Sequence, residues 1–324
     1  MDIQSTADLL DFCERENKTI AEAMIEQERV KSGKSKQEIF NMMKERLMKM
    51  QHAVEEGLDD ASEAPSGISG GDAVKMKAYI EAGDVLSGSI ISDAMACSMA
   101  TSESNARMGV IVATPTAGAA GILPGVLFSL HKNTEMELDD LVMGLFTASM
   151  LGYIIANRSF ISGAAGGCQA EVGSATAMAA GTIVELKGGS PKQAVHATAM
   201  AMKSLLGLVC DPVAGLVEVP CIKRNVIGTS IAFSSADMAL AGVESRIPCD
   251  EVIDTMYDIG KNMPRPLKET ALGGLAITPT GQKVKERLFS KTGLVNRLGG
   301  GKHDEPHNNG NGTSRTEKAE VGNR

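Results

Sequence analysis

The stretch QAEVGSATAMAAGTIVELK, residues 169–187, decides the fold class. Small and apolar residues dominate it, above all alanine, and no continuous polar face runs along it. A helix without a polar face is buried against other helices. Because similar stretches recur along the chain, the sequence predicts an all-α bundle of small-residue-rich buried helices. These helices are expected at residues 72–82, 88–103, 118–132, 137–155, 169–187, 191–208, 225–241 and 250–261.

The two ends of the chain differ from this middle part. Residues 1–61 have apolar side chains near helical spacing and predict an amphipathic helical segment. The stretch SEAPSGISGGDA (62–73) is rich in Pro, Ser and Gly and interrupts the helical pattern. Residues 299–324 are polar and cannot bury enough apolar surface to order themselves. We therefore expect an N-terminal helical segment (1–61), a compact domain (62–298) and a disordered tail (299–324). Val110–Thr114 is the best candidate for a strand.

Composition excludes several classes of function. The chain has 324 residues, a net charge of −8 and 3% aromatic residues, so it offers nucleic acid neither a basic face nor stacking rings. The N-terminus lacks the basic and apolar regions of a secretory signal, so we expect a cytoplasmic protein. Two uncharged runs, 108–130 and 141–157, are rich in small residues and are expected to be buried segments, with no membrane contact.

The six cysteines fall into two groups by their surroundings. Cys13 and Cys97 lie within helical patterns and are expected to be buried as small hydrophobic residues. Cys249 precedes a predicted helix and is expected to be an incidental surface thiol. The other three lie at predicted helix ends beside Gly or Pro, where the loop backbone sets the position of the sulfur: Cys168, Cys210 and Cys221.

Three thiolates brought together at helix ends suit an iron–sulfur cluster, because a helix N-terminus favours the charged form of a thiol. The spacing of the three cysteines in the sequence does not show whether they bind a cluster. The separations are 42 residues (168 to 210) and 11 residues (210 to 221), unlike the tight CxxC pairs of zinc ribbons or ferredoxins. From the pattern alone, a cluster and three unrelated thiols both remain open.

Four stretches resemble the α chain of iron–sulfur-dependent L-serine dehydratase, an L-serine ammonia-lyase. They are SGISGGDAVK (66–75), SESNARMGVIVATPTAGAAGILPGVL (102–127), SGAAGGCQAEVG (162–173) and CDPVAGLVEVPCIKRN (210–225). The resemblance runs from about residue 4 to about residue 290. It implies a [4Fe–4S] cluster on three cysteines of this chain: Cys168, Cys210 and Cys221.

The resemblance also implies the reaction. A cluster held by three cysteines leaves one iron without a protein ligand, and that iron can act as a Lewis acid on the hydroxyl group of L-serine. Loss of water and of the Cα proton gives 2-aminoacrylate, which tautomerises and hydrolyses to pyruvate and ammonia. The catalytic base is unknown, with Thr116 and His196 as candidates.

Candidate substrate-binding residues lie in or near the same motifs: Ser69, Gly70, Asn105, Thr116, Gly166 and Gly167. Several have structural alternatives that the residues leave open. Thr116 can be a helix N-cap, the Ser69–Gly71 stretch an ordinary loop, and Asn105 a helix C-cap. The two glycines are expected to let a ligand come close to the cluster.

One departure from the family concerns a partner. Single-chain members carry an additional N-terminal domain with substrate motifs that are missing here, so the resemblance implies a separate β chain that can also supply the base. The rival functions are a cysteine desulfidase-type lyase of the same superfamily and a non-catalytic iron–sulfur sensor. A structural zinc site is a third alternative, although zinc sites usually have four ligands.

Overall fold

The computed structural model describes residues 2–291, and within them it contains α-helices and short helical turns but no strand. Only an isolated bridge between Cys210 and Lys268 has β geometry. The predicted all-α class is confirmed. Among the described residues, 2–285 form one compact unit and 286–291 belong to a second one. The α-helices of the described residues are α1 (Thr6–Glu16), α2 (Ile20–Ser32), α3 (Lys36–Asp59), α4 (Asp72–Glu81), α5 (Gly88–Ala106), α6 (Ile122–Asn133), α7 (Leu138–Arg158), α8 (Gly163–Gly166), α9 (Ser174–Leu186), α10 (Pro191–Lys203), α11 (Cys221–Leu240), α12 (Cys249–Asn262) and α13 (Pro279–Lys291).

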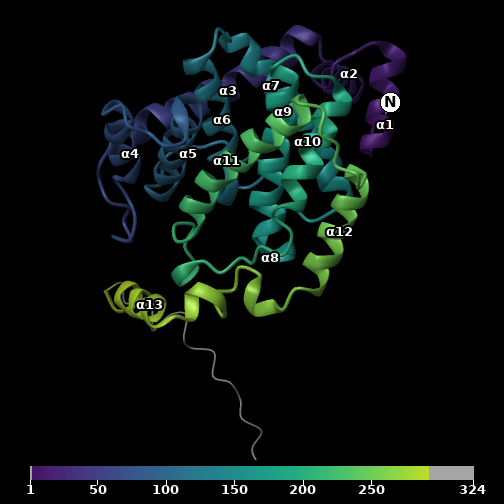
Figure 1. Cartoon of the computed structure of the whole chain (residues 1–324). Coiled ribbons are helices and arrows are strands. Elements are labelled where there is room, and N and C mark those ends of the chain that lie inside the picture. The colour runs from purple at the N-terminus through teal and green to yellow at the C-terminus, as the bar shows by residue number, and fades with distance from the viewer. Residues whose placement is uncertain (1, 292–324) are drawn as a thin grey trace, which may run out of the picture. The chain divides into compact units, whose positions relative to one another are not determined.

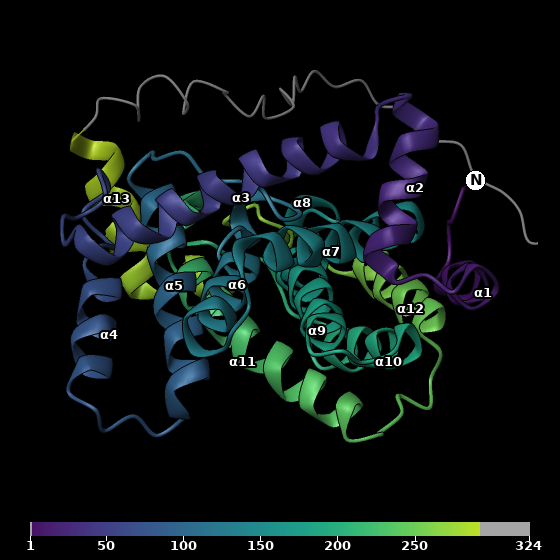
Figure 2. The same cartoon turned by 90° about the horizontal axis from the view of Figure 1, so that it is seen from above.

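Helix α9 is the centre of the larger unit, as Figures 1 and 2 show. It packs against α6, α7, α10 and α11, and all its residues from Ser174 to Val184 are buried. Small residues make this close packing possible. A Cβ atom on Gly181 would lie 2.4 Å from Leu151 of α7 and 2.6 Å from the hydroxyl of Thr198 on α10. The lack of a polar face therefore predicted both the helix and its burial correctly.

Carboxylates from later helices hold the first two of the three N-terminal helices to this core. Each of the three helices has its own capping box, at Ser5, Thr19 and Ser35. In addition, Asp250 of α12 accepts backbone hydrogen bonds of 2.9 and 3.2 Å from the first turn of α1. Glu185 of α9 accepts bonds of 2.8 and 3.0 Å from the first turn of α2. These contacts attach α1 and α2 to the helices that follow.

Some details differ from the sequence-based expectations. Val110–Thr114 is irregular, since no neighbouring segment pairs with it. The prediction of a surface thiol at Cys249 is wrong, because α12 begins at this residue and turns its side chain inward, leaving it 3% exposed. Helix α10 ends at Lys203, before the expected residue 208. The tail predicted at 299–324 lies outside the described residues.

Helix α7 is long and apolar enough to cross a membrane by length and composition, and it is the only such helix among residues 2–291. Within the unit it packs against α9, α2 and α3. In its most apolar 18-residue window, 61% of the residues are buried by these and other neighbours. This burial matches the expectation of a core segment.

Candidate active site

The three cysteines singled out by sequence lie at the ends of helical segments in the larger unit. Cys168 comes directly before the π-helical turn Gln169–Gly173, which leads into α9. Cys210 follows α10, and its backbone exchanges hydrogen bonds of 2.8 Å with Leu267 and Glu269. Cys221 is the first residue of α11. All three are buried and carry free thiols.

Gln169 ties the first of these segments to its surroundings. Its side-chain amide donates hydrogen bonds of 3.0 Å to the carbonyl oxygens of Gly166 and Met256, and its amide oxygen accepts one of 2.9 Å from the backbone of Gly207. The backbone N–H of Gln169 donates to Leu208 at 2.9 Å. One buried side chain thus fixes the Cys168 turn to α12 and to the segment that leads to Cys210.

Two of the cysteines and one carboxylate form a group that can hold a metal ion. The sulfurs of Cys168 and Cys210 and a carboxylate oxygen of Glu171 all lie within 4.8 Å of one another. Gly163 lies against this group, since a Cβ atom there would be 2.7 Å from the Cys210 sulfur and 3.0 Å from Glu171. Buried sulfur donors suit iron or zinc, whereas magnesium and calcium prefer oxygen ligands.

The thiols interact electrostatically. A hydrogen bond from Cys210 and the positive charge of Arg224 lower the pKa of Cys168 below its usual value. The same hydrogen bond, together with burial, raises the pKa of Cys210. Burial and the nearby Cys168 thiolate raise the pKa of Cys221 to about 12. The raised pKa values of Cys210 and Cys221 favour their protonated forms, and a metal displaces these protons on binding.

Arg224 supplies positive charge beside the cysteines. It lies one turn after Cys221 on α11, and its guanidinium contacts the Cys168 sulfur. It also contacts the carboxylate of Asp211 at 2.9 Å and donates to the carbonyl of Val209 at 2.8 Å. A cation in this place offsets the negative charge that thiolates introduce into a buried site.

Glu171 is a site residue that the sequence-based list of candidates omitted. It is buried, and burial together with the nearby charge of Glu269 raises its pKa. Its carboxylate accepts a 2.9 Å hydrogen bond from the hydroxyl of Thr116. The available signal was its position three residues after Cys168 in a helical stretch, because residues three apart share one side of a helix. The Thr116 side chain caps no helix, so the N-cap alternative is not realised.

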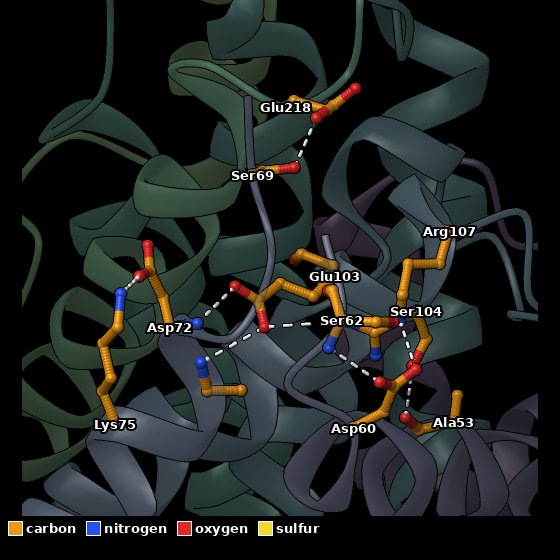
Figure 3. A network of polar contacts seen from close by, with 12 residues as sticks. Ala53, Asp60, Ser62, Ser69, Asp72, Lys75, Glu103, Ser104, Arg107 and Glu218 are labelled. Atoms are coloured by element: carbon orange, nitrogen blue, oxygen red, sulfur yellow. Dashed lines mark hydrogen bonds and ion pairs between the residues drawn. The ribbon is translucent and has the colours of Figure 1, made fainter. Parts of the chain in front are cut away.

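Residues 61–71, which we call the serine loop, lie against the segment between Cys210 and Cys221. Glu218 in that segment is 5% exposed and accepts hydrogen bonds from the hydroxyls of Ser66, at 2.7 Å, and Ser69. Figure 3 shows the Ser69 contact. Gly70 has a φ of 130°, and a Cβ atom there would lie 2.3 Å from the carbonyl oxygen of Ser62. This close approach of the chain to itself requires glycine at this position.

Both ends of the serine loop are held by charged side chains (Figure 3). At its start, Asp60 accepts a 2.8 Å hydrogen bond from the backbone of Ser62 and pairs with Arg107 at 3.0 Å. At its end, Glu103 is completely buried and accepts bonds of 2.9 and 3.2 Å from the first two N–H groups of α4. The loop has no regular secondary structure, yet its conformation is set by these contacts.

Comparison with known proteins places these features in a family. A family model described as serine dehydratase alpha chain matches residues 15–276. The chain belongs to this family. The probable L-serine dehydratase alpha chain of Bacillus subtilis (strain 168) is 51% identical over 286 residues, which are 88% of this chain and 95% of that protein. The L-serine dehydratase alpha chain of Peptoniphilus asaccharolyticus is 39% identical over 291 residues, 90% of this chain and 99% of that one.

Longer relatives match in part. The L-serine dehydratase 2 of Escherichia coli (strain K12) is 46% identical over 181 residues, which are 55% of this chain but 40% of the E. coli protein. The resemblance to the serine dehydratase alpha chain that the sequence motifs indicated is thus confirmed.

The remaining predicted site residues of this alpha-chain family member have clear surroundings. Asn105 is half-buried in the last turn of α5, where its carbonyl accepts a 3.0 Å bond from Met108. A Cβ atom on Gly166 would lie 2.9 Å from Ala170, and one on Gly167 would lie 2.5 Å from the Met263 sulfur. Protein atoms therefore fill the space beside both glycines.

His196 of α10 is not brought to the cysteines by any contact in the described residues. Its Nδ1 atom accepts a 3.3 Å hydrogen bond from the backbone of Ser245, and its Nε2 atom lies 3.9 Å from Glu244. Partial burial lowers its pKa. Its role as a catalytic base stays a prediction.

Proposed function

We propose that this chain is the cluster-bearing subunit of an iron–sulfur-dependent L-serine dehydratase, which converts L-serine to pyruvate and ammonia. One observation carries the proposal: buried cysteines from segments far apart in the sequence meet beside Glu171, in a chain of the serine dehydratase alpha-chain family. The serine loop supports it, because Glu218 connects that loop to the segment between two of the cysteines.

The donor set fits a [4Fe–4S] cluster held by Cys168, Cys210 and Cys221. All three thiols are buried, two of the sulfurs lie in one group, and glycine at position 163 leaves space beside Cys210. When bound, such a cluster supplies a Lewis acid that makes the hydroxyl group of serine a better leaving group. Arg224 balances the charge of the thiolates, and Glu171 holds Thr116 beside them.

Binding of the substrate is assigned to the serine loop and to neighbouring residues. The backbone N–H groups of Gly70 and Gly71 are available to a carboxylate, since neither donates to a group in the described residues. Such backbone donors at a helix start are a common anion site, and Gly71 immediately precedes α4. Thr116, with its hydroxyl proton directed to Glu171, offers its oxygen as an acceptor. Asn105, Gly166 and Gly167 remain weaker candidates for substrate contact.

A separate β chain is the proposed partner. The match to the E. coli dehydratase covers 40% of that protein, so the E. coli protein contains a large additional region. We assign the catalytic base to the partner, since no contact in residues 2–291 brings His196 to the cysteines. The proposed compartment is the cytoplasm, where thiols stay reduced, consistent with the free thiols of all six cysteines.

Iron analysis of anaerobically purified protein tests the proposed cofactor. We expect about four irons per chain and a brown colour. Changing Cys168, Cys210 or Cys221 to serine removes the iron, because each supplies one ligand. The matched controls Cys13→Ala, Cys97→Ala and Cys249→Ala change equally buried cysteines and keep it.

Substrate assays separate the rival activities. With the β chain present, the reconstituted enzyme is expected to form pyruvate from L-serine and to release little sulfide from L-cysteine. Full iron content in Cys168→Ser, Cys210→Ser or Cys221→Ser would contradict the ligand assignment. Preferential release of sulfide from L-cysteine would favour the desulfidase alternative.

A further inference from the structure

Glu218 is a buried carboxylate without a positive partner. Its exposed fraction is 5%, yet no lysine, arginine or histidine among residues 2–285 forms an ion pair with it. The nearby cations are engaged elsewhere: Lys223 pairs with Asp72 at 2.5 Å, and Arg224 pairs with Asp211 at 2.9 Å. Burying an unpaired charge is costly, so such groups are normally neutralised by a counter-charge. This site therefore calls for a cation from outside the described chain.

The hydrogen bonds of the two serines determine what they can offer to a ligand. A hydroxyl group has one proton, and a carboxylate can only accept. Ser66 and Ser69 both donate their proton to the same Glu218 oxygen, Oε2. The Ser66 oxygen also accepts a 3.2 Å bond from the backbone of Ile68. The Ser69 oxygen and Glu218 Oε1 accept no bond from the described residues, which leaves two free acceptors next to each other.

Donors lie on the same loop, immediately after these acceptors. The backbone N–H groups of Gly70 and Gly71 have no acceptor in residues 2–291, although Gly71 is buried. Buried backbone donors nearly always have a partner in the functional state of a protein. The loop thus presents a pair of acceptors with a negative charge beside a pair of donors. A zwitterionic α-amino acid has the complementary arrangement, an ammonium group beside a carboxylate.

We propose that Glu218 and Ser69 bind the α-ammonium group of the substrate, while the N–H groups of Gly70 and Gly71 bind its carboxylate. The proposal rests on the serine dehydratase function argued above. It adds which residues make the site specific for an amino acid. Ser69 acts as an acceptor, because Glu218 takes its proton, and therefore does not bind the carboxylate. Glu218 selects 2-amino acids over 2-hydroxy acids, since only the amino acid brings the missing positive charge.

The experiment uses the reconstituted two-chain holoenzyme and compares L-serine with glycerate. Glycerate has the carboxylate and the 3-hydroxyl group of serine but a hydroxyl group in place of the ammonium group. In Glu218→Gln, we expect the KM for L-serine to rise by about 10- to 100-fold, the range of a lost charge-assisted hydrogen bond. The inhibition constant of glycerate should change by less than about twofold, because glycerate does not use the charge.

Two further variants keep the test specific. Ser69→Ala removes one acceptor and is expected to raise the KM for L-serine while leaving inhibition by glycerate unchanged. Glu81→Gln removes an exposed carboxylate at the far end of α4, outside the serine loop, and should change neither constant. Iron content is measured for every variant, so that loss of the cluster is not mistaken for loss of binding. If Glu218→Gln lacks iron, the KM for L-serine and the inhibition constant of glycerate in Ser69→Ala decide whether the proposal holds.

The outcomes separate this proposal from the function on which it rests. Equal weakening of serine and glycerate by Glu218→Gln, with iron retained, would mean that Glu218 only holds the loop in place. An unchanged KM for serine would also overturn the proposal. Weaker inhibition by glycerate in Ser69→Ala would show that Ser69 donates to the carboxylate. Failure of the wild-type holoenzyme to convert L-serine would instead contradict the proposed function.

Discussion

Gly163 lies where two candidate metal ligands leave no room for a side chain. A Cβ atom at this position would be 2.7 Å from the Cys210 sulfur and 3.0 Å from Glu171. The backbone φ of Gly163 is not in the left-handed region, so alanine fits its backbone conformation. The cost of alanine comes only from steric overlap of its methyl group with Cys210 and Glu171. The space next to the Cys210 sulfur therefore depends on glycine at position 163, and one added methyl group would fill it.

We expect Gly163→Ala to lower the iron content of the purified chain. The methyl group displaces Cys210 or Glu171 and costs about 1–3 kcal/mol through overpacking. Gly173→Ala is the matched control, since its nearest contact at 3.7 Å leaves room for the methyl group. Alanine there should be neutral or stabilise the chain by about 0.5–1 kcal/mol. Equal iron in both variants, measured after anaerobic purification, would contradict this assignment of Gly163.

At this scale the sequence predicted part of the site. The position of three cysteines beside Gly or Pro at helix ends distinguished them from Cys13 and Cys97, and the structure brings Cys168 and Cys210 together. Glu171 and Glu218 were not predicted. Glu171 contacts Thr116, which is 55 residues away in the sequence, and Glu218 contacts Ser69, which is 149 residues away. The residues next to each glutamate in the sequence carry no information about such distant partners.

Helix α4 illustrates how an element depends on side chains from other elements. Its first residue, Asp72, pairs with Lys223 of α11 at 2.5 Å and with Lys75 of its own next turn at 2.8 Å. Its first two N–H groups donate to Glu103 of α5. Because Gly71 offers no side-chain cap, these contacts replace the local capping that α1, α2 and α3 have.

Asp72→Asn is expected to destabilise the chain in a pH-dependent way. Hydrogen bonds from Lys223 and Lys75 hold the pKa of Asp72 below its ordinary value of 3.8. A carboxyl with a lowered pKa stabilises the folded state above its unfolded pKa and loses that contribution as pH falls through its folded pKa. Near neutral pH we expect a loss of about 0.5–1.5 kcal/mol, the sum of a partly exposed ion pair and a helix-dipole contact.

Urea unfolding at several pH values measures this effect. The difference between wild type and Asp72→Asn should shrink as the pH falls below 3.8. Asp84→Asn, which removes an exposed carboxylate shortly after the same helix, is the control and should have no effect. A difference that is constant across the pH range would exclude the charge of Asp72 as its cause.

Helix positions were more predictable than helix ends. The apolar stretches indicated the helices of the bundle, because composition decides burial over many residues at once. The ends depend on single contacts. Helix α11 begins at Cys221 and not at the expected residue 225. The backbone carbonyl of Glu218 accepts a 3.0 Å hydrogen bond from the backbone N–H of Ile222, which extends the helix backward.

At the scale of the whole molecule, the proposed active site needs a second chain. We predict that this chain alone binds iron but forms pyruvate from L-serine slowly or not at all, because the described residues bring no histidine to the cysteines. General-base catalysis contributes about 10²- to 10⁴-fold, and loss of activity in this range is expected. Addition of the β chain should restore it, as measured by pyruvate formation after titration with the partner. Full activity of the isolated chain would place the base on this chain.

The cysteines are held in place by a core of packed apolar side chains. Two groups of buried apolar side chains contain most of the large core residues. Gln169 attaches the Cys168 turn to neighbouring segments through hydrogen bonds with Met256, Gly207 and Leu208. We therefore expect this scaffold to fold without iron, unlike a zinc finger. If oxygen damaged the proposed iron–sulfur cluster, the protein around it would stay folded, and repair would require fresh iron and sulfide but no new protein.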